Sequence, residues 1–564
     1  MWEKARQRSL GKRSGNSCGF ELILAQAAVL GSLLAASLAG TPYQRRGNCV
    51  TVVLPGGWAR VEWQSQGAFH FTRGWGRPEI CGAAGNGGAV EFADHDDINA
   101  IKLQSGNLTV RVEKVTGRLS VAAGSVTLME QSGGAHRSRQ GVTIRFHRFM
   151  GERYQGLGMR DGPVFLQHGR INTKRAFLIS NRGFGLYFPF PAAYEADLGE
   201  PGSSITVVKA PGAARLELYF YQGGSPREIF EEHLASCGAV MRMSARDAQI
   251  QPPTKWPAEA SPLPIVGPPS WNSLRATVRA IVNASLSAML LPAWDLASWR
   301  SAPAKLHRRA AQLAVFVPLL GDSTPTNARP EHPPLDLFSA QLRARLLPFL
   351  LTYALEAQER GYPIIHPLGM QYPRDQQGAV ADDQFLFGDE ILVAPALGEN
   401  SRRTVYLPMG SWTDLRSNQI YPGKRTVEIE VPNHAAALLV KNGSLIPLEA
   451  EQAGAAMELH YFPALGAEFF LAEKEPWNPS QFHAAPAGDY YRLETESKQD
   501  RDYEWVVHHL DPPSKVWEAE DIYLEVSEPA LLANGCWYYD RERRDLHVRQ
   551  RGRAGADQVI HIAF

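Results

Sequence analysis

The sequence predicts a mixed fold in which two β-rich regions flank a central helical region. Short apolar runs separated by 50 Gly and 39 Pro residues are typical of antiparallel strands joined by many turns. Helical periodicity is sustained only in the centre of the chain. The 564 residues are enough for several domains. We therefore expect an N-terminal antiparallel β-sandwich, a helical centre and C-terminal β-sandwich domains.

A basic segment followed by an apolar segment opens the chain. The apolar stretch Leu22–Leu38 is near the short limit for a membrane span. Its positive flank favours a cytoplasmic N-terminus. We expect a cytoplasmic basic tail over residues 1–17 and a signal anchor over residues 18–40. This arrangement gives a single-pass type II membrane protein with a luminal or extracellular body. The alternatives are secretion after signal cleavage near Ala39 and a buried soluble helix.

The cysteines fit an oxidising compartment. Cys49 and Cys81 flank the first β region, so we predict a disulfide between them. Cys237 and Cys536 form either a second bridge or two buried free thiols. Cys18 lies at the predicted membrane edge, where palmitoylation is an option.

Three sequons support the same compartment. They begin at Asn107, Asn283 and Asn442, and each has a Ser or Thr two residues later. Asn283 lies inside an apolar helical pattern, which makes it the least accessible of the three. We predict N-glycosylation at these asparagines.

The charge balance excludes several classes of partner. Lys and Arg total 58, and so do Asp and Glu, so no overall field favours nucleic acid. We find no nucleic-acid motif and expect no cofactor and no metal. The acidic run 93–97, "ADHDD", fits a solvated turn better than a cation site.

Period-2 alternation dominates residues 48–240. Leu108, Val110 and Val112 fall on one face of a strand, and the residues between them are polar. A helix is expected after Ser225, because Ser225 and Glu228 form a capping box around Pro226. A loose stretch follows, then helical patterns over 271–289, 305–317 and 335–360. Strand patterns return from Phe385 to the end of the chain.

Several of these segments together resemble one enzyme family. They include "ERYQGLG" (152–158), "AFLISNRGFGL" (176–186), "DDQFLFGDEILVAPAL" (382–397) and "RRTVYLPMGSWTDL" (402–415). Their order and spacing are similar to those of glycoside hydrolase family 31, which includes α-glucosidases and α-xylosidases. The predicted anchor also resembles the family's membrane-anchored branch. The resemblance implies a catalytic (β/α)8 barrel between the two β regions.

The space for that barrel is too short. A complete barrel needs about 250 residues, and residues 253–395 supply 143. We therefore expect an incomplete (β/α)8-type barrel remnant over 253–395. The remaining boundaries then become 48–240 for the N-terminal β-sandwich, 396–455 for a proximal C-terminal β domain and 456–564 for a distal one. A spliced or truncated product is the simplest explanation.

The catalytic carboxylates implied by the resemblance are missing. A retaining glycosidase needs two carboxyl groups about 5–5.5 Å apart. The nucleophile motif has no counterpart, and the family's acid/base motif aligns with Gly267-Pro268-Pro269. The only carboxylates between Cys237 and Gly321 are those of Asp247, Glu259 and Asp295.

One acidic residue remains as a candidate. Asp295 matches a site aspartate of the family and is equally explained as a turn residue. Asp322 fits a loop, and the resemblance gives Asp382 and Asp383 a structural role.

The sequence therefore predicts a membrane-anchored glycosidase-like glycoprotein without catalysis. One alternative is an active α-glycosidase that uses carboxylates not identified from the sequence. Another is an anion- or carbohydrate-binding protein. A carbohydrate or glycoconjugate is the expected partner, and the oligomeric state is left open. A chain that does not fold stably is a further possibility, because half a barrel has open edges.

Overall fold

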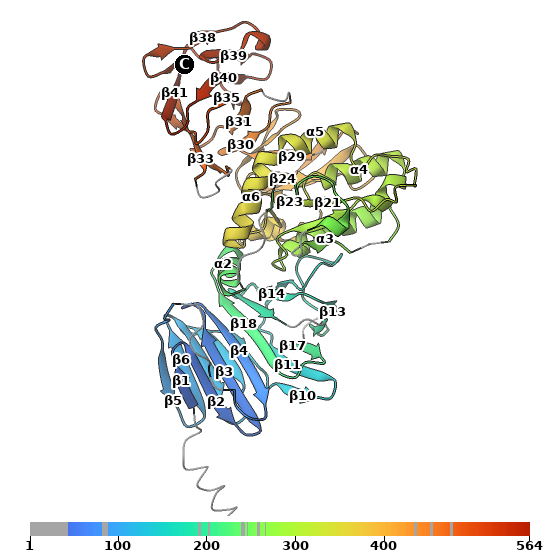
Figure 1. The fold of residues 1–564 in the computed structure, drawn as a ribbon, viewed down its shortest axis with the longest axis vertical. Coiled ribbons are helices and arrows are strands. Elements are labelled where there is room, and N and C mark those ends of the chain that lie inside the picture. Colours follow the sequence, from blue (N-terminus) through green and yellow to red (C-terminus); the bar gives the residue numbers. More distant parts are fainter. Residues whose placement is uncertain are drawn as a thin grey trace, which may run out of the picture.

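The computed structural model describes residues 43–79, 81, 88–189, 193–200, 203–237, 243–244, 246–256, 260–264, 267–433, 437–451, 455–473 and 478–564. The predicted basic tail, the predicted anchor, Cys18 and Glu259 lie outside these residues. The β-rich N-terminal part and the distal C-terminal part occupy opposite ends of the long axis, with the helices between them (Figure 1). The predicted mixed fold is thus confirmed.

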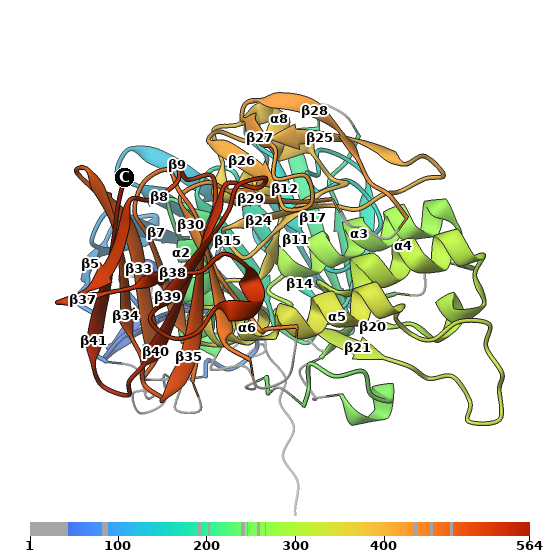
Figure 2. The same ribbon diagram turned by 90° about the horizontal axis from the view of Figure 1, so that it is seen from above.

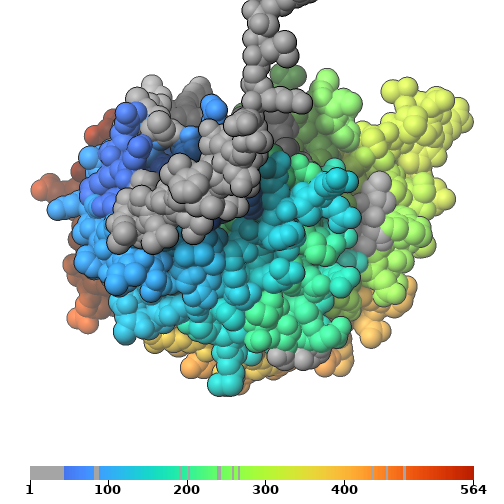
Figure 3. Space-filling view, turned by 90° about the horizontal axis from the view of Figure 1, so that it is seen from below, coloured from blue at the N-terminus to red at the C-terminus, as the bar shows by residue number. Residues whose placement is uncertain are grey.

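The N-terminal part contains three antiparallel sheets. Their strand orders are β1-β2-β3-β4-β18-β15-β14-β12, β5-β6-β7-β8-β9 and β10-β11-β17-β16-β13. These sheets form most of the face seen from below (Figure 3). The bounds are β1 Tyr43–Arg46, β2 Cys49–Leu54, β3 Gly57–Trp63, β4 Ala68–Trp75, β5 Ala93–Asp96, β6 Ala100–Ser105, β7 Leu108–Glu113, β8 Leu119–Ala123, β9 Val126–Glu130, β10 His136–Ser138, β11 Gly141–His147, β12 Tyr154–Gly156, β13 Arg170–Thr173, β14 Ala176–Ser180, β15 Phe184–Phe188, β16 Tyr194–Asp197, β17 Ile205–Pro211 and β18 Leu216–Gln222.

Alternating burial creates one core between these sheets. Leu108, Val110 and Val112 are fully buried, as their period predicts, and they share the core with Trp63 and Phe71. Cys49, at the start of β2, is bridged to Cys81 with a Cα–Cα distance of 6.1 Å. The thiols of Cys237 and Cys536 are free, and neither residue is fully buried. The second bridge considered from the sequence is therefore not formed.

The centre of the chain contains a parallel sheet of three short strands, ordered β19-β20-β21. Helix α3 connects β19 to β20, and α4 connects β20 to β21, which makes two βαβ units. Helices α3, α4 and α5 lie together on the side away from the distal sheets (Figure 2). None of the described helices is both long and apolar enough to cross a membrane. The bounds are α2 Pro226–Cys237, η1 Pro253–Lys255, β19 Ser261–Pro262, α3 Trp271–Ser285, β20 Pro292–Asp295, η2 Ala297–Ser301, α4 Ala304–Ala314, β21 Leu319–Gly321, α5 Leu337–Arg345, α6 Leu347–Arg360, α7 Leu368–Gln371 and α8 Gln376–Val380.

The two faces of this parallel sheet are covered differently. Trp294 and Leu320 belong to the large core that the helices share. On the other face, Leu291, Ala293 and Leu319 form a small cluster with Trp256 and Met243 packed against it. In the described part of the chain, this cluster lies where a complete barrel would have its interior.

The C-terminal part divides into two β domains. The proximal domain has a sheet ordered β22-β23-β24-β29-β26-β27 and the pair β25-β28, and the distal domain has two six-stranded sheets. The bounds are β22 Ile365–His366, β23 Phe385–Phe387, β24 Ile391–Ala394, β25 Arg402–Leu407, β26 Ser411–Asp414, β27 Ile420–Pro422, β28 Arg425–Glu430, β29 Ala437–Lys441, β30 Ser444–Leu448, β31 Met457–Phe462, β32 Ala467–Leu471, β33 Ser480–Ala487, β34 Tyr490–Glu496, β35 Arg501–Val507, β36 Lys515–Glu518, β37 Asp521–Ile522, β38 Leu524–Glu525, η3 Pro529–Leu531, β39 Cys536–Asp540, β40 Asp545–Gly552 and β41 Asp557–Ala563.

Strand pairing draws the domain boundaries at residues other than those expected from the sequence. We expected the barrel remnant to end at residue 395 and the proximal domain to end at residue 455. Instead, β22, β23 and β24 already belong to the proximal sheet, and β30 pairs with β31 of the distal domain. The reason is physical, because sheet membership is decided by hydrogen bonds between strands distant in sequence.

A buried arginine fixes the connection between α4 and β21. Arg343, on α5, is only 7% exposed. Its guanidinium donates to five backbone carbonyl oxygens, at 2.8–3.4 Å, those of Ala248, Ala314, Val315, Val317 and Pro318. Burial lowers the pKa of Arg343 to about 10, so the side chain stays charged at neutral pH.

Arg343→Met should therefore lower the free energy of unfolding by more than about 3 kcal/mol, because five buried carbonyl groups lose their donor. Chemical denaturation of the full-length chain measures the effect. Arg402→Met is the control, since the Arg402 side chain is 74% exposed and pairs only with Glu428, and it should change the stability by less than about 0.5 kcal/mol. Equal effects of the two substitutions would contradict the role given to Arg343.

Candidate functional site

The carboxyl ends of β20 and β21 are the natural place to look for a site. Parallel strands bring their carboxyl ends to one edge of a sheet, and (β/α)8 enzymes hold their catalytic residues there. Asp295 is the last residue of β20, and Asp322 follows β21 directly. We call this edge, with Asp295, Arg300, Asp322 and Ser323, the barrel edge.

The carboxylate of Asp295 is occupied by contacts within the barrel edge. Its Oδ1 accepts from the backbone N–H groups of Ala297 (3.1 Å) and Ser323 (3.0 Å), and its Oδ2 accepts from the Ser323 hydroxyl. These contacts fasten the loop after β21 to the end of β20. They are the contacts of a turn aspartate, the second explanation considered from the sequence.

Asp322 is occupied as well. Its Oδ2 accepts from Arg300 at 2.6 Å, and its Oδ1 accepts from the backbone N–H of Thr324 at 3.0 Å. In the strand register, Asp295 lies opposite Gly321 and not opposite Asp322. The barrel edge therefore holds two aspartates, each tied to its own partners.

An indole ring occupies the inner side of the barrel edge. Trp256 donates from Nε1 to the carbonyl oxygen of Leu320 at 3.3 Å. The ring lies so close to Gly321 that a Cβ at this position would come within 2.4 Å of Trp256 Cζ2. Glycine is thus required at position 321. Sequence reasoning missed this contact, because Trp256 lies in a stretch without periodicity.

The position aligned with the acid/base residue serves only to start a helix. Ser270 is the N-cap of α3 and forms a capping box with Ser273, whose hydroxyl also donates to the Pro268 carbonyl oxygen at 3.0 Å. Gly267, Pro268 and Pro269 bring no side-chain proton to the barrel edge.

The remaining acidic residues named from the sequence have other partners. Asp382 pairs with Arg279 of α3 at 2.9 Å, and Asp383 pairs with Arg403 at 2.8 Å. The first ion pair connects α3 to the proximal β domain and the second lies within that domain, in keeping with the structural role implied by the resemblance. Asp247 caps a turn through Ser244.

The acidic run 93–97 pairs with cations of the protein. Asp94 contacts Arg45, Asp96 contacts Lys114, and Asp97 contacts Lys102. Within the described ranges, no group of three or more His, Cys, Asp or Glu side chains is placed to hold a metal ion.

The sequons differ in accessibility. Asn107 lies in an exposed turn, and Asn442 is half-buried with its Oδ1 accepting from Thr413 at 2.7 Å. Asn283 is fully buried. Its amide donates to the carbonyl oxygens of Arg160 and Gly162 at 2.9 and 3.1 Å. Glycosylation of Asn283, predicted from the sequon, is therefore incompatible with the folded chain.

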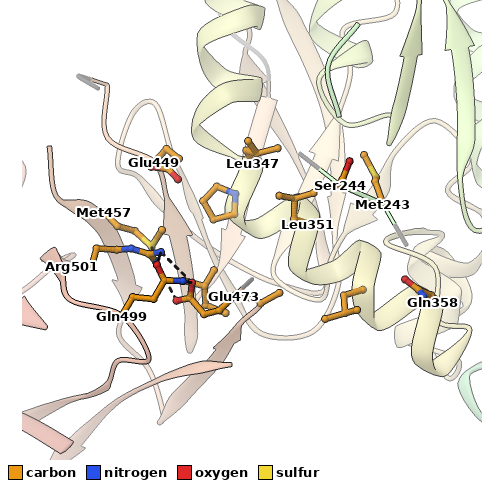
Figure 4. A pocket seen from close by; sticks show the side chains of 14 residues that line it. Met243, Ser244, Leu347, Leu351, Gln358, Glu449, Met457, Glu473, Gln499 and Arg501 are labelled. Atoms are coloured by element: carbon orange, nitrogen blue, oxygen red, sulfur yellow. Dashed lines mark hydrogen bonds and ion pairs between the residues drawn. The ribbon is translucent and has the colours of Figure 1, made fainter. Parts of the chain in front are cut away.

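A cavity of about 640 Å³ lies between part of α6 and the distal domain (Figure 4). Leu347, Leu351 and Leu355 of α6 form one wall, and an ion pair of Glu473 with Arg501 at 3.1 Å lies on the other. Glu473 also accepts from Gln499 at 2.7 Å. This cavity lies outside the barrel edge, and it is also lined by Glu449, so its wall carries one more acidic than basic side chain.

Glu390 is a perturbed carboxyl that sequence reasoning missed. It lies in the turn between β23 and β24 and accepts from the Tyr353 hydroxyl through both oxygens, at 2.7 and 2.9 Å. Burial, followed by the neighbouring Asp389 carboxylate, raises the pKa of Glu390 to about 8. Although part of the residue is exposed, its carboxyl is taken up by Tyr353, so the role of Glu390 is structural.

Glu390 should make stability depend on pH. Because its folded pKa of about 8 lies above the usual value of 4.5, the folded state retains a proton that the unfolded state loses. The free energy of unfolding should therefore fall between about pH 4.5 and 8, by up to about 1.4 kcal/mol per pH unit from this group. Glu390→Gln should flatten that slope in urea titrations, whereas Glu428→Gln, at an exposed glutamate, should not. A slope unchanged by Glu390→Gln would contradict the assignment.

Comparison with known proteins shows which family of enzymes this chain is similar to. The profile of the glycosyl hydrolase family 31 C-terminal domain matches residues 361–446. An α-glucosidase of Saccharolobus solfataricus is 26% identical over 199 residues, which cover 33% of this chain and 28% of that protein. Mouse neutral α-glucosidase AB is 32% identical over 108 residues, covering 19% and 11% respectively. The chain spans less than a third of the length of these relatives.

The whole arrangement is also similar to a solved structure. The Flavobacterium johnsoniae dextranase of family 31, in complex with isomaltotriose, superposes with a TM-score of 0.80 at 14% identity, covering 93% of this chain and 99% of that one. The fold is that of a glycoside hydrolase with flanking β domains. Residues 361–446 thus match the C-terminal domain of glycoside hydrolase family 31, and the fold as a whole is similar to that of a family 31 enzyme.

Proposed function

We propose that this protein binds carbohydrate without hydrolysing glycosidic bonds. The observation that supports the proposal is the state of Asp295, whose two oxygens accept from Ala297 and Ser323 instead of facing a second carboxyl. Hydrolysis with retention needs one free carboxylate and one proton donor about 5–5.5 Å apart. At the described barrel edge, the acid/base position carries prolines, and Trp256 covers the inner side.

Carbohydrate as the partner is supported by the structural neighbours. The dextranase similar in fold is in complex with isomaltotriose, and a Listeria monocytogenes protein of similar fold is in complex with glucose. Gluco-configured saccharides are therefore the first ligands to test.

An active α-glycosidase is the second candidate, because the curated relatives include α-glucosidases. It requires a carboxylate and a proton donor that are available for catalysis, whereas Asp295 and Asp322 at the described barrel edge are each bonded to neighbouring residues. The two proposals differ in one measurable property: only an active α-glycosidase would release the aglycone from an α-glycoside.

We also propose a single-pass type II membrane topology with the body on the luminal or extracellular side. The Cys49–Cys81 bridge supports an oxidising compartment. The apolar segment Leu22–Leu38 with its basic flank would supply the anchor, and secretion after cleavage remains the alternative.

The full-length chain should release no 4-nitrophenol from 4-nitrophenyl α-D-glucopyranoside above the uncatalysed rate. The reason is that neither aspartate of the barrel edge is free to attack the anomeric carbon. A cooperative thermal transition of the same preparation confirms that the tested chain is folded. Turnover that disappears in Asp295→Asn and persists in Asp521→Asn, at an exposed aspartate, would establish the active enzyme instead.

Glycan occupancy should report the topology. Expressed in mammalian cells, the full-length chain should lose apparent mass on treatment with peptide N-glycosidase. Asn107→Gln with Asn442→Gln should remove the entire shift, because Asn283 is buried. Resistance of the chain to extraction by alkaline carbonate separates an anchor from a cleaved signal. A mass shift that persists in the double variant would contradict the accessibility argument.

A further inference from the structure

A second cavity lies between the N-terminal sheets and the α7–α8 segment. Its volume is about 550 Å³, within the range of about 300–1,000 Å³ typical of small-ligand sites. We call it the interdomain cavity. Its wall includes Arg153, which precedes β12, Gln155 of β12, Phe165, the first residues of α2, and Gln376 of α8. Sites at contacts between domains are a common location for ligands.

The strongest feature of this cavity is Gln155. The residue is only 6% exposed, and its backbone pairs with that of Ile179 in β14. Its side-chain amide lines the cavity and makes no hydrogen bond to any described residue. An amide that faces a cavity instead of a protein partner keeps its hydrogen-bonding groups available to water or to a ligand. The Gln155 amide therefore offers a donor and an acceptor to a molecule inside the cavity.

Two more polar side chains add unused hydrogen-bonding groups. Arg153 and Gln376 are exposed at the wall of the cavity, and neither side chain is paired with another described residue. Together with Gln155 they provide one guanidinium and two amides. Amides present a donor and an acceptor side by side, which suits neighbouring hydroxyl groups of one molecule.

The apolar part of the wall completes the chemistry. Phe165, Ile179 and Ile229 supply an aromatic ring and two aliphatic side chains. A pyranose ring has a face of C–H groups that packs against such a surface while its hydroxyl groups reach the polar side chains. The residues that line the cavity include no Asp, Glu, His or Cys.

An anion is a poorer fit than a neutral molecule. The N-terminus of α2 borders the cavity and would attract negative charge. However, Glu228 already occupies it, accepting from the Gly224 N–H at 2.8 Å and from the Ser225 hydroxyl at 3.1 Å. Only Arg153 remains as an uncompensated charge at the described wall.

We propose that the interdomain cavity binds a hexopyranose unit of a glycan, with the Gln155 amide as its central contact. The inference rests on the proposed function of carbohydrate binding and gives it a location away from the barrel edge. The wall carries no acid or base, so the sugar is held and not cleaved. The interdomain cavity is formed without the barrel strands, so the proposed sugar site does not depend on a complete barrel.

The test is calorimetric titration of the full-length chain, in a detergent without sugar groups, with isomaltotriose and with methyl α-D-glucopyranoside. We expect saturable binding that Gln155→Leu weakens at least about tenfold, the equivalent of about 1.4 kcal/mol. Arg153→Met should weaken it about threefold or more. Gln481→Leu, at an exposed strand glutamine of the distal domain, is the matched control and should bind like the wild type. The melting temperature of Gln155→Leu should not fall by much, because the Gln155 amide makes no hydrogen bond to a described residue that the substitution would remove.

The outcomes separate the site from the function. Binding that Gln155→Leu and Arg153→Met leave unchanged overturns the site and leaves carbohydrate binding standing. Absence of saturable binding to both saccharides overturns both. Binding of inorganic phosphate in place of the saccharides, lost in Arg153→Met, overturns the assignment of a neutral sugar. Release of glucose from isomaltotriose during the titration contradicts the proposed function, whereas the site still holds if Gln155→Leu weakens binding.

Discussion

The hydrogen bonds of Arg343 are the constraint on which the central part of the molecule depends. The segment 314–318 brings the chain from α4 into β21, and its carbonyl groups point to the Arg343 guanidinium. No described carboxylate pairs with this cation, so carbonyl dipoles alone compensate its burial. Because the same guanidinium binds Ala248, it also fixes the segment that leads to Trp256. The Arg343 guanidinium thus fixes both the position of β21 and the segment carrying Trp256, which packs against that strand.

This arrangement explains how an incomplete barrel forms a closed core. Parallel strands normally need cover on both faces. Helices cover one face, and Trp256 with Met243 covers the other in place of further strands. The same cover brings the Trp256 ring against Gly321, at the inner side of the barrel edge. Closure of the sheet and the proposed absence of catalysis at the barrel edge would therefore have one cause.

Local features could be predicted from the sequence, and contacts distant in sequence could not. The alternation at Leu108, Val110 and Val112 predicted a half-buried strand, and helix α2 begins at Pro226, the first position after the predicted cap. Asp295 was foreseen as a site or turn residue, and only its contacts with Ser323 decide between them. The Trp256–Gly321 contact and the free amide of Gln155 depend on which segments meet in space. No periodicity or motif in those segments indicates that they come into contact in the folded chain.

Strand β19, one of the two edge strands of the parallel sheet, has a consequence for solubility. Strand β19 consists of Ser261 and Pro262 only, and proline cannot donate a backbone hydrogen bond. An exposed sheet edge recruits strands from other molecules when it is long and able to pair. With two residues, one of them proline, this edge is a poor template for such recruitment. A shortened barrel can therefore resist self-association through this edge, whereas a longer open strand would favour aggregation.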